Sequence, residues 1–192
     1  MQKERKVNDM PLQKEKRYTA EEFLAITSES NEHYELIDGE IINFASPSEI
    51  HQDISGEIFG ELRDYIKKNK GGCKLFHAAF DVKLSDDTIV QPDILIVCDK
   101  NKLDGHKCNG APDFVVEITS ESNWTNDYHR KFTLYQKYGI REYWIVSPTD
   151  QRVVVHNFEK GKLNEIYMFS DDIPVGIYNG KITINLKELL RL

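Results

Sequence analysis

Two short apolar runs constrain the fold of this chain more than any other feature of its sequence. Residues 94–97 read ILIV, and residues 114–119 read FVVEIT. Neither run alternates between apolar and polar side chains, and such continuous runs are typical of strands buried on both faces of a sheet. A sheet buried on both faces needs other elements packed against each face. We therefore expect a central sheet between layers of helices.

Two segments have the pattern of helices that would cover this sheet. In residues 47–70, apolar side chains recur at the three- and four-residue spacing of one buried helix face. We expect this helix to be capped by Ser46 or Ser48 and to end at Gly71-Gly72. A second helix is predicted over residues 125–138, where the cap is Thr125 or Asn126, the helix ends at Gly139, and the inner face carries Tyr128, Phe132, Tyr135 and Tyr138.

The remaining segments predict shorter elements around this core. Thr19 followed by Glu22 forms a capping box that opens a short helix. Residues 34–44 hold two β-prone runs around an Asp-Gly turn, which predicts a β-hairpin. Residues 75–84 alternate with a period of two, which predicts one strand. After a strand at residues 143–146, we expect antiparallel strands at 152–158, 163–169 and 181–186.

The order of these elements predicts an α/β (α+β) fold with a central mixed β-sheet flanked by helices, an N-terminal β-hairpin and C-terminal antiparallel strands. The chain has 192 residues, which suits one domain, and we place that domain at residues 18–192. Residues 1–17 are polar and without periodicity, so we expect a disordered or loosely held tail. No run approaches the roughly 20 apolar residues that span a bilayer, and no secretory signal is visible. We therefore expect no membrane partner and a cytoplasmic location.

Charge and cysteine content argue against two classes of protein, those that coat nucleic acid by charge alone and those built on a disulfide framework. The net charge is −7, and the tail carries six Lys/Arg against three Asp/Glu, so residues 18–192 carry −10. An acidic body argues against a protein that coats nucleic acid by charge alone. Three cysteines make a disulfide framework improbable. A zinc site built from Cys73, His77, His106 and Cys108 is an alternative to free thiols, but its spacing matches no common zinc motif.

Carboxylates in and beside the apolar runs are the most unusual polar residues. Glu117 lies among Val and Ile residues, where an unpaired carboxylate is costly to bury; a half-exposed strand would explain it otherwise. Asp93 follows a proline and directly precedes the 94–97 run; the alternative to a site residue is an ordinary turn residue. Asp113 also follows a proline, but it lies about 13 Å along the strand from Glu117, too far to share one cation. Asp93 is the better partner because neighbouring strands lie about 4.8 Å apart.

The order of the predicted elements and the motifs within them resemble those of a known family. The order of helix, three strands, helix and strand, with Pro92-Asp93 and Glu117-Ile118-Thr119, is similar to the restriction-endonuclease-like superfamily of PD-(D/E)xK nucleases. More closely, the runs YELIDGE (34–40), APDFVVE (111–117) and GIREYWIV (139–146), together with His51 and Asp127-x3-Lys131, resemble the Uma-type restriction endonucleases. The resemblance runs from about Tyr18 to the C-terminus.

The resemblance implies roles for six residues. Asp93 and Glu117 would be metal carboxylates, and the main-chain carbonyl of Ile118 would be a further ligand. The superfamily lysine two residues after the glutamate is Thr119 here, and Lys131 would take its place. Glu35 and His51 would complete the catalytic pocket.

Each of the last three residues has an ordinary alternative. An Asp127–Lys131 surface ion pair would explain Lys131, an exposed strand position would explain Glu35, and a first-turn helix position would explain His51.

The function implied is Mg²⁺-dependent hydrolysis of phosphodiester bonds by an endonuclease, with Mn²⁺ as a substitute ion and DNA as the expected substrate. Oxygen ligands suit Mg²⁺ better than zinc. A catalytically inactive binding module for nucleic acid or protein on the same scaffold is the alternative, because a fold does not fix a function. A purely structural protein is a third option. Homodimer formation stays open.

Overall fold

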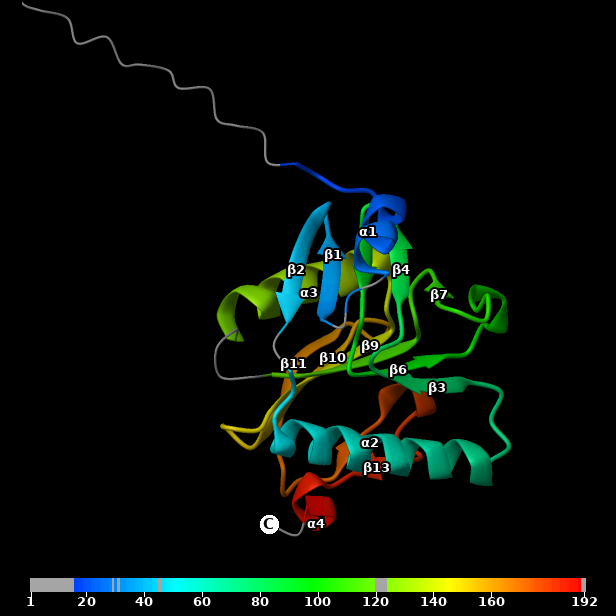
Figure 1. The fold of residues 1–192 in the computed structure, drawn as a ribbon. Coiled ribbons are helices and arrows are strands. Elements are labelled where there is room, and N and C mark those ends of the chain that lie inside the picture. The colour runs from blue at the N-terminus through cyan, green and yellow to red at the C-terminus, as the bar shows by residue number, and fades with distance from the viewer. Residues whose placement is uncertain (1–15, 29, 31, 45, 120–123, 191–192) are drawn as a thin grey trace, which may run out of the picture.

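Two large sheets are joined at a corner, with a long helix below and a second helix beside the hairpin (Figure 1), and a small two-stranded sheet lies in the C-terminal segment. The structure is a computed structural model that describes residues 16–28, 30, 32–44, 46–119 and 124–190. The expected tail at residues 1–17 lies, apart from its last two residues, outside the described residues. Within the described ranges, no helix has the length and apolarity that crossing a bilayer requires.

The central sheet has the strand order β11-β10-β9-β8-β6-β3. Its strands are β3 (Lys74–His77), β6 (Ile94–Val97), β8 (Phe114–Ile118), β9 (Glu142–Ser147), β10 (Arg152–Asn157) and β11 (Lys162–Met168). The pair β8–β9 is parallel and the other pairs are antiparallel, so the sheet is mixed, as expected. The two apolar runs are the inner strands β6 and β8, which confirms their predicted place.

Helices α2 (Glu49–Lys68) and α3 (Trp124–Tyr138) cover opposite faces of this sheet (Figure 1). Successive side chains of a strand point to opposite faces. Ile94 and Ile96 accordingly pack in one core cluster with α2, whereas Leu95 and Val97 pack in another with α3. The α2 side also holds the C-terminal elements β12 (Ile173–Pro174), η2 (Gly176–Tyr178), β13 (Thr183–Ile184) and α4 (Leu186–Leu190).

The second sheet has the order β2-β1-β5-β4-β7 and stands over the α3 side. It contains the predicted hairpin of β1 (His33–Ile37) and β2 (Glu40–Phe44), followed by β5 (Thr88–Val90), β4 (Val82–Ser85) and β7 (Cys108–Asn109). The hairpin turn places Asp38 and Gly39 at φ of 49° and 82°. Asp and Gly tolerate this left-handed backbone, so the turn follows from the sequence.

The single strand predicted over residues 75–84 is wrong. The segment forms β3 in the central sheet and β4 in the second sheet, and the chain crosses between the sheets in residues 78–81. Alternation reports which side chains face a core, but it does not report that the chain changes sheets on the way. The crossing is marked by Phe76 and Phe80, whose rings stack at 4.1 Å between centroids.

Helix ends agree with the predictions in part. Helix α1 (Ala20–Thr27) has the expected Thr19–Glu22 capping box, and Ser48, not Ser46, caps α2. Helix α2 ends at Lys68, and the left-handed position after it is Lys70 (φ 51°), not one of the two glycines.

Two other boundaries differ from the predictions. Helix α3 already includes Trp124, so the predicted start at residue 125 is one residue late, and the side chains around that start lie outside the described residues. The strand expected at residues 181–186 shortens to β13, and helix α4 follows it.

A disulfide between Cys73 and Cys98 corrects the expectation of free thiols. The two residues are 25 apart in sequence, but the register Lys74↔Val97 continued by one residue sets them directly opposite each other. Sequence spacing does not show this neighbourhood, because the pairing of β3 with β6 is needed to see it. The bond also removes Cys73 from the zinc-site alternative. Cys108 is buried with a free thiol.

Candidate active site

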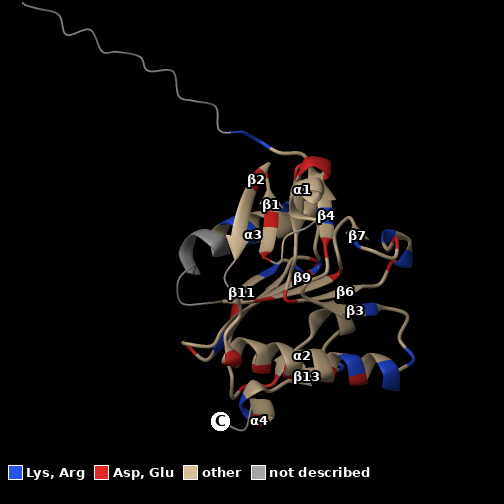
Figure 2. Cartoon of the chain, in the orientation of Figure 1, with Lys and Arg blue, Asp and Glu red and all other residues tan. Residues whose placement is uncertain are grey.

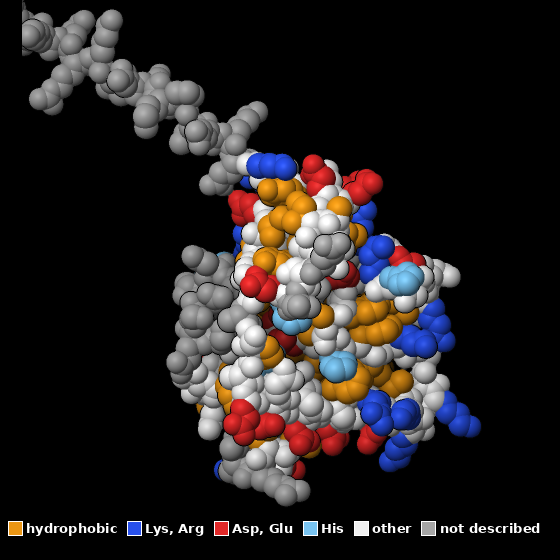
Figure 3. Space-filling model, in the orientation of Figure 1, with side chains coloured by type: hydrophobic (Ala, Val, Ile, Leu, Met, Phe, Trp, Pro, Cys, Tyr) orange, Lys and Arg blue, Asp and Glu red, His pale blue; other side chains and the backbone are white. Residues whose placement is uncertain are grey.

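A cavity of about 320 Å³ lies where the hairpin, α2 and the central sheet meet. Dark red acidic atoms are visible in the recess at the middle of this face of the molecule (Figure 3). All of the sequence-predicted site residues line the cavity: Glu35, His51, Asp93, Glu117, Ile118 and Lys131. The structure thus brings together residues from the hairpin, two helices, β8 and the position just before β6.

Asp93 and Glu117 are direct cross-strand neighbours. The antiparallel register Ile94↔Val116 continued by one residue places Asp93 opposite Glu117, and side chains at such positions have Cβ atoms about 5 Å apart. Asp93 Oδ2 accepts a hydrogen bond from the backbone N–H of Ile118 at 2.7 Å. The same oxygen lies 3.2 Å from His51 Nε2, so the long helix helps to fix the Asp93 carboxylate.

Lys131 reaches the cavity from α3 and is buried. Its Nζ donates to Glu117 Oε1 at 3.0 Å and to Glu35 Oε1 at 3.1 Å. The ammonium also lies 5.1 Å from the ring centroid of Phe44, within range of a cation–π contact. Only 6% of the Lys131 side chain is exposed, so Lys131 is not the surface residue that the alternative assumed; the side chain of Asp127 lies outside the described residues.

Glu35 is also buried, which excludes the alternative of an exposed strand position. Its Oε1 accepts from the backbone N–H of Gln91 at 2.8 Å in addition to Lys131. Because Gln91 lies just before the Pro92-Asp93 pair, this bond ties the hairpin to the chain that leads into β6. Glu35 therefore links the second sheet to the cavity.

Tyr135 is a site residue that the sequence interpretation assigned only to the helix core. Its hydroxyl donates to Glu117 Oε1, the oxygen that also accepts from Lys131. The available signal was its position four residues after Lys131, because residues i and i+4 share a helix face. A tyrosine carries a polar group beyond its apolar ring, so it fits at the boundary between core and cavity.

The electrostatics of the cluster centre on Glu117. Burial raises the pKa of Glu117 to about 8, Lys131 opposes this rise, and the charges of Glu35 and Asp93 add to it. Burial and the neighbouring Glu117 charge also hold the pKa of Tyr135 well above its usual range. The cavity therefore gathers more negative than positive charge in the absence of a bound cation, which favours a cationic ligand.

Thr119 occupies the strand position where the superfamily pattern has lysine. Its hydroxyl donates to the carbonyl oxygen of Val146 at 3.2 Å, at the end of β9. Thr119 therefore serves a strand contact and brings no charge to the cavity. Lys131 is the cation that lies beside Glu117.

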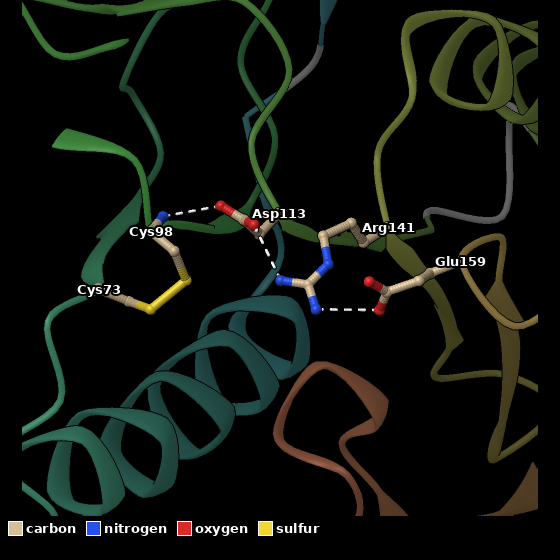
Figure 4. Close-up of a disulfide and its surroundings, with 5 residues drawn as sticks. All are labelled: Cys73, Cys98, Asp113, Arg141 and Glu159. Atoms are coloured by element: carbon tan, nitrogen blue, oxygen red, sulfur yellow. Dashed lines mark hydrogen bonds and ion pairs between the residues drawn. A yellow bond between two sulfur atoms is a disulfide. The ribbon is translucent and has the colours of Figure 1, made fainter. Parts of the chain in front are cut away.

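Asp113, the competing Pro-Asp candidate, and Arg130, the residue next to Lys131, lie outside the cavity lining. Asp113 accepts from the backbone N–H of Cys98 at 2.7 Å and from Arg141 at 3.0 Å, next to the disulfide (Figure 4). Arg130 donates to the Ile37 carbonyl and to Glu40 on the hairpin. Both residues have structural partners, and neither faces Glu117.

Glu142 is a further buried carboxylate that the sequence interpretation did not single out. It accepts from the Trp144 indole N–H and from the backbone N–H groups of Gly176 and Ile177, all within 2.9 Å. A Cβ at Gly176 would lie 2.7 Å from Glu142 Oε2, so this close approach needs glycine. These bonds attach the C-terminal segment to β9, and they identify Glu142 as a structural acid.

The donor chemistry of the cavity suits a hard divalent cation. Within the part of the chain that the structure describes, no group of three or more His, Cys, Asp or Glu residues forms a metal cluster. A Mg²⁺ site does not need three, because this ion keeps several waters and binds one or two carboxylates together with substrate phosphates. Asp93 and Glu117, with the Ile118 carbonyl, match that smaller set.

Comparisons with known proteins agree with this fold. A search of curated proteins finds no match. Among solved structures, one similar chain is described as "a putative nuclease belonging to DUF820" from Anabaena variabilis, with a TM-score of 0.75, 21% identity, and coverage of 90% of this chain and 97% of that chain. This similarity confirms the restriction-endonuclease-like fold. A model of the Uma2 family, "Putative restriction endonuclease", matches residues 20–175. The chain belongs to the Uma2 family.

Proposed function

We propose that the protein is a divalent-metal-dependent endonuclease that hydrolyses phosphodiester bonds, with DNA as substrate and Mg²⁺ or Mn²⁺ as the ion. One observation carries the proposal. Asp93 and Glu117 lie opposite each other at the edge of a cavity, and the Lys131 ammonium lies 3.0 Å from Glu117. Two carboxylates with a lysine beside them combine a cation site with a fixed positive charge, as phosphodiester hydrolysis requires.

In this proposal, Asp93, Glu117 and the Ile118 carbonyl hold the ion. The ion would polarise the scissile phosphate and lower the pKa of a bound water. Lys131 orients the attacking water or stabilises the negative charge that develops on the phosphate. Its ammonium is available for this role because Glu35 and Glu117 hold it at the cavity from two sides.

His51 and Tyr135 are positioning residues. His51 Nε2 contacts Asp93 Oδ2, and the Tyr135 hydroxyl contacts Glu117 Oε1. Each of the two proposed metal carboxylates thus has a neighbouring side chain that helps to fix its rotamer. Ligands held in this way lose less conformational freedom when they bind an ion.

A catalytically inactive binding module is the second candidate function. The specific observation in its favour is that Lys131 already bonds to two carboxylates, which partly neutralises the cluster without any ion. If this internal pairing is the purpose of the lysine, the cavity would bind a ligand and leave it intact.

A plasmid assay separates the two functions. Supercoiled DNA is incubated with the purified chain and Mg²⁺, Mn²⁺ or EDTA, and the same is done with Glu117→Gln and with Glu159→Gln as a matched surface control. We expect nicking by the wild type and the control in the presence of metal, and none by Glu117→Gln or with EDTA. Cleavage that persists with EDTA, or that is equal in Glu117→Gln, would rule out the proposed mechanism. DNA binding without cleavage in either metal would favour the binding module.

A further inference from the structure

One end of α2 and the start of β3 carry an unusual concentration of positive charge. Residues 63–74 contain five basic residues and one acid, whereas residues 18–192 as a whole carry −10. The basic surface is defined by the side chains Arg63, Lys67, Lys68, Lys70 and Lys74, all of which are exposed. Within the described ranges, no carboxylate forms an ion pair with any of the five.

The helix dipole explains only part of this distribution. The first three turns of α2 carry Asp and Glu but no Lys or Arg, whereas residues 63–68 carry three basic residues and one acid; Figure 2 shows red segments toward the start of the helix and mainly blue ones toward its end. Dipole effects fall off within the first and last turn of a helix. Arg63 lies more than one turn before the helix end at Lys68, and Lys70 and Lys74 lie beyond it. A separate reason is needed for these cations.

The basic surface leads directly to the cavity. Strand β3 begins at Lys74 and ends at His77, and His77 lines the cavity together with Ala78 and Ala79. Three residues of a strand span about 10 Å. His77, Ala78 and Ala79 are exposed, and β3 is an edge strand of the central sheet, so no further strand stands between this path and solvent.

The covalent and backbone structure fixes the direction of this path. The Cys73–Cys98 disulfide holds the residue before Lys74 against the end of β6. The backbone N–H of Gly71 donates to the Ile66 carbonyl at 2.8 Å, which closes the end of α2. The basic surface therefore has a set orientation relative to the cavity.

We propose that the basic surface binds the phosphate backbone of the nucleic acid on one side of the scissile bond, so that the strand runs along β3 into the cavity. This inference rests on the proposed function and adds where the substrate lies. Each strand of duplex DNA carries one phosphate charge per 3.4 Å of helix axis, so about 10 Å of axis lying along β3 from Lys74 to His77 presents about three phosphates of one strand. Such contacts fix the register of the substrate and do not read its sequence.

A binding experiment without cleavage tests the inference. The probe is a fluorescein-labelled DNA duplex of about 20 base pairs, in Ca²⁺ or EDTA, and fluorescence anisotropy gives Kd over a range of salt concentrations. The test variant replaces Lys67, Lys68 and Lys74 by Gln. The matched control replaces Lys137, Lys181 and Lys187 by Gln, which are exposed and lie outside the cavity lining.

We expect the test variant to raise Kd about tenfold or more at low salt and to reduce the slope of log Kd against log salt by about 2 to 3, roughly one for each lost phosphate contact. The control should stay within about twofold of the wild type. An unchanged Kd and slope in the test variant, with wild-type cleavage intact, would overturn the inference and leave the proposed function standing. If the wild type neither binds nor cuts DNA in Mg²⁺ or Mn²⁺, both fail.

A second probe distinguishes nucleic acid from an acidic protein. Polyglutamate of similar charge replaces the duplex in the same titration. We expect weaker binding of polyglutamate than of DNA. Equal binding of both probes, lost equally in the test variant, would indicate a docking surface for acidic proteins and overturn the assignment to nucleic acid.

Discussion

Asp93 and Asp113 look alike in sequence and in local structure, yet they lie in different surroundings. Each follows a proline and precedes an inner strand of the central sheet. Each also accepts a hydrogen bond at 2.7 Å from a backbone N–H just at or beyond the end of the neighbouring strand, Ile118 for Asp93 and Cys98 for Asp113. Because β6 and β8 are antiparallel, the two aspartates stand at opposite ends of the strand pair.

The difference between the two ends lies in the elements around them. At the Asp113 end, Arg141 bonds to Asp113 and to Glu159, so the charges are paired (Figure 4). At the Asp93 end, Glu117 and Glu35 add negative charge, and a cavity opens beside them. A Pro-Asp pair therefore hydrogen-bonds to the neighbouring strand at each end of the β6–β8 pair. Only the end at which further carboxylates lie beside the aspartate is a candidate active site.

The largest expected difference between the two ends is in cleavage. Asp93→Asn keeps an oxygen that can accept from the Ile118 N–H but removes a metal carboxylate, so we expect cleavage to fall by about 1,000-fold or more. Asp113→Asn should stay within about threefold of the wild type. Initial rates of plasmid nicking in Mn²⁺ measure both. Equal loss in the two variants, with intact folds by circular dichroism, would contradict the assignment of Asp93 and not Asp113 to the metal site.

Lys131→Met tests whether the lysine beside the carboxylates is required for cleavage at the Asp93 end. We expect cleavage to fall below detection while Mn²⁺ still binds, because the carboxylates hold the ion and the lysine acts on the substrate. Without metal, the variant should lose about 3 kcal/mol of unfolding free energy, since Glu35 and Glu117 lose their cation.

Arg130→Met is the neighbouring control on the same helix, and it should keep its cleavage activity. Calorimetric Mn²⁺ titration and urea unfolding give the binding and stability values. Full cleavage by Lys131→Met would refute the assignment.

Alanine variants of the two aspartates should separate them by stability. Asp113→Ala leaves the Cys98 N–H without its acceptor and removes a partner of Arg141, so we expect a loss of about 2 kcal/mol. Asp93→Ala leaves the Ile118 N–H without its acceptor but relieves repulsion with Glu117, so its loss in EDTA should be about 1 kcal/mol or less. Urea unfolding of both variants checks the order, and the reverse order would contradict it.

The smallest expected effect is a pH dependence that belongs to the cavity end. The pKa of Glu117 is raised to about 8 by burial, above its usual 4.5, so the folded metal-free protein holds this proton more tightly than the unfolded chain. The stability from this proton is present at low pH and is lost as the pH rises through 8. Between pH 7 and 9 we expect a loss of about 1 kcal/mol in EDTA, reduced in Glu117→Gln.

This pH range lies above the titration of His156 but overlaps that of the Cys108 thiol in the unfolded chain, because burial raises the pKa of Cys108 to about 11 in the folded protein. Burial lowers the pKa of His156 to about 4, so His156 affects stability only in the acidic range. An equal slope in Glu117→Gln and the wild type would assign the alkaline loss to another group.

Much of the fold around the cavity could be predicted from the sequence, because the patterns that indicate these elements lie within short segments of the chain. Continuous apolar runs predicted β6 and β8, a 3.6-residue period predicted α2, and an Asp-Gly turn predicted the hairpin. The contrast between Asp93 and Asp113 also followed from strand geometry. The family resemblance was needed for Glu35 and His51, since nothing in their own neighbourhoods distinguishes them from ordinary surface residues.

The features that escaped prediction depend on contacts between distant segments. The Cys73–Cys98 disulfide needs the register of β3 with β6, and the division of residues 75–84 needs the existence of a second sheet. Glu142 was overlooked because its partners, the N–H groups of residues 176 and 177, belong to the C-terminal segment. A single sequence does not report such pairings.

The neighbouring residues Arg130 and Lys131 have a consequence for the order in which the protein acquires activity. They bond to the hairpin across 90 to 96 positions of the chain, whereas Asp93 and Glu117 are 24 apart in numbering and meet by the pairing of two strands. Closing a long loop is entropically costlier than closing a short one, and such contacts form later in folding. A growing chain that has reached only β8 thus holds both acids but lacks the lysine, so in the proposed mechanism hydrolysis would begin only after α3 has joined the hairpin.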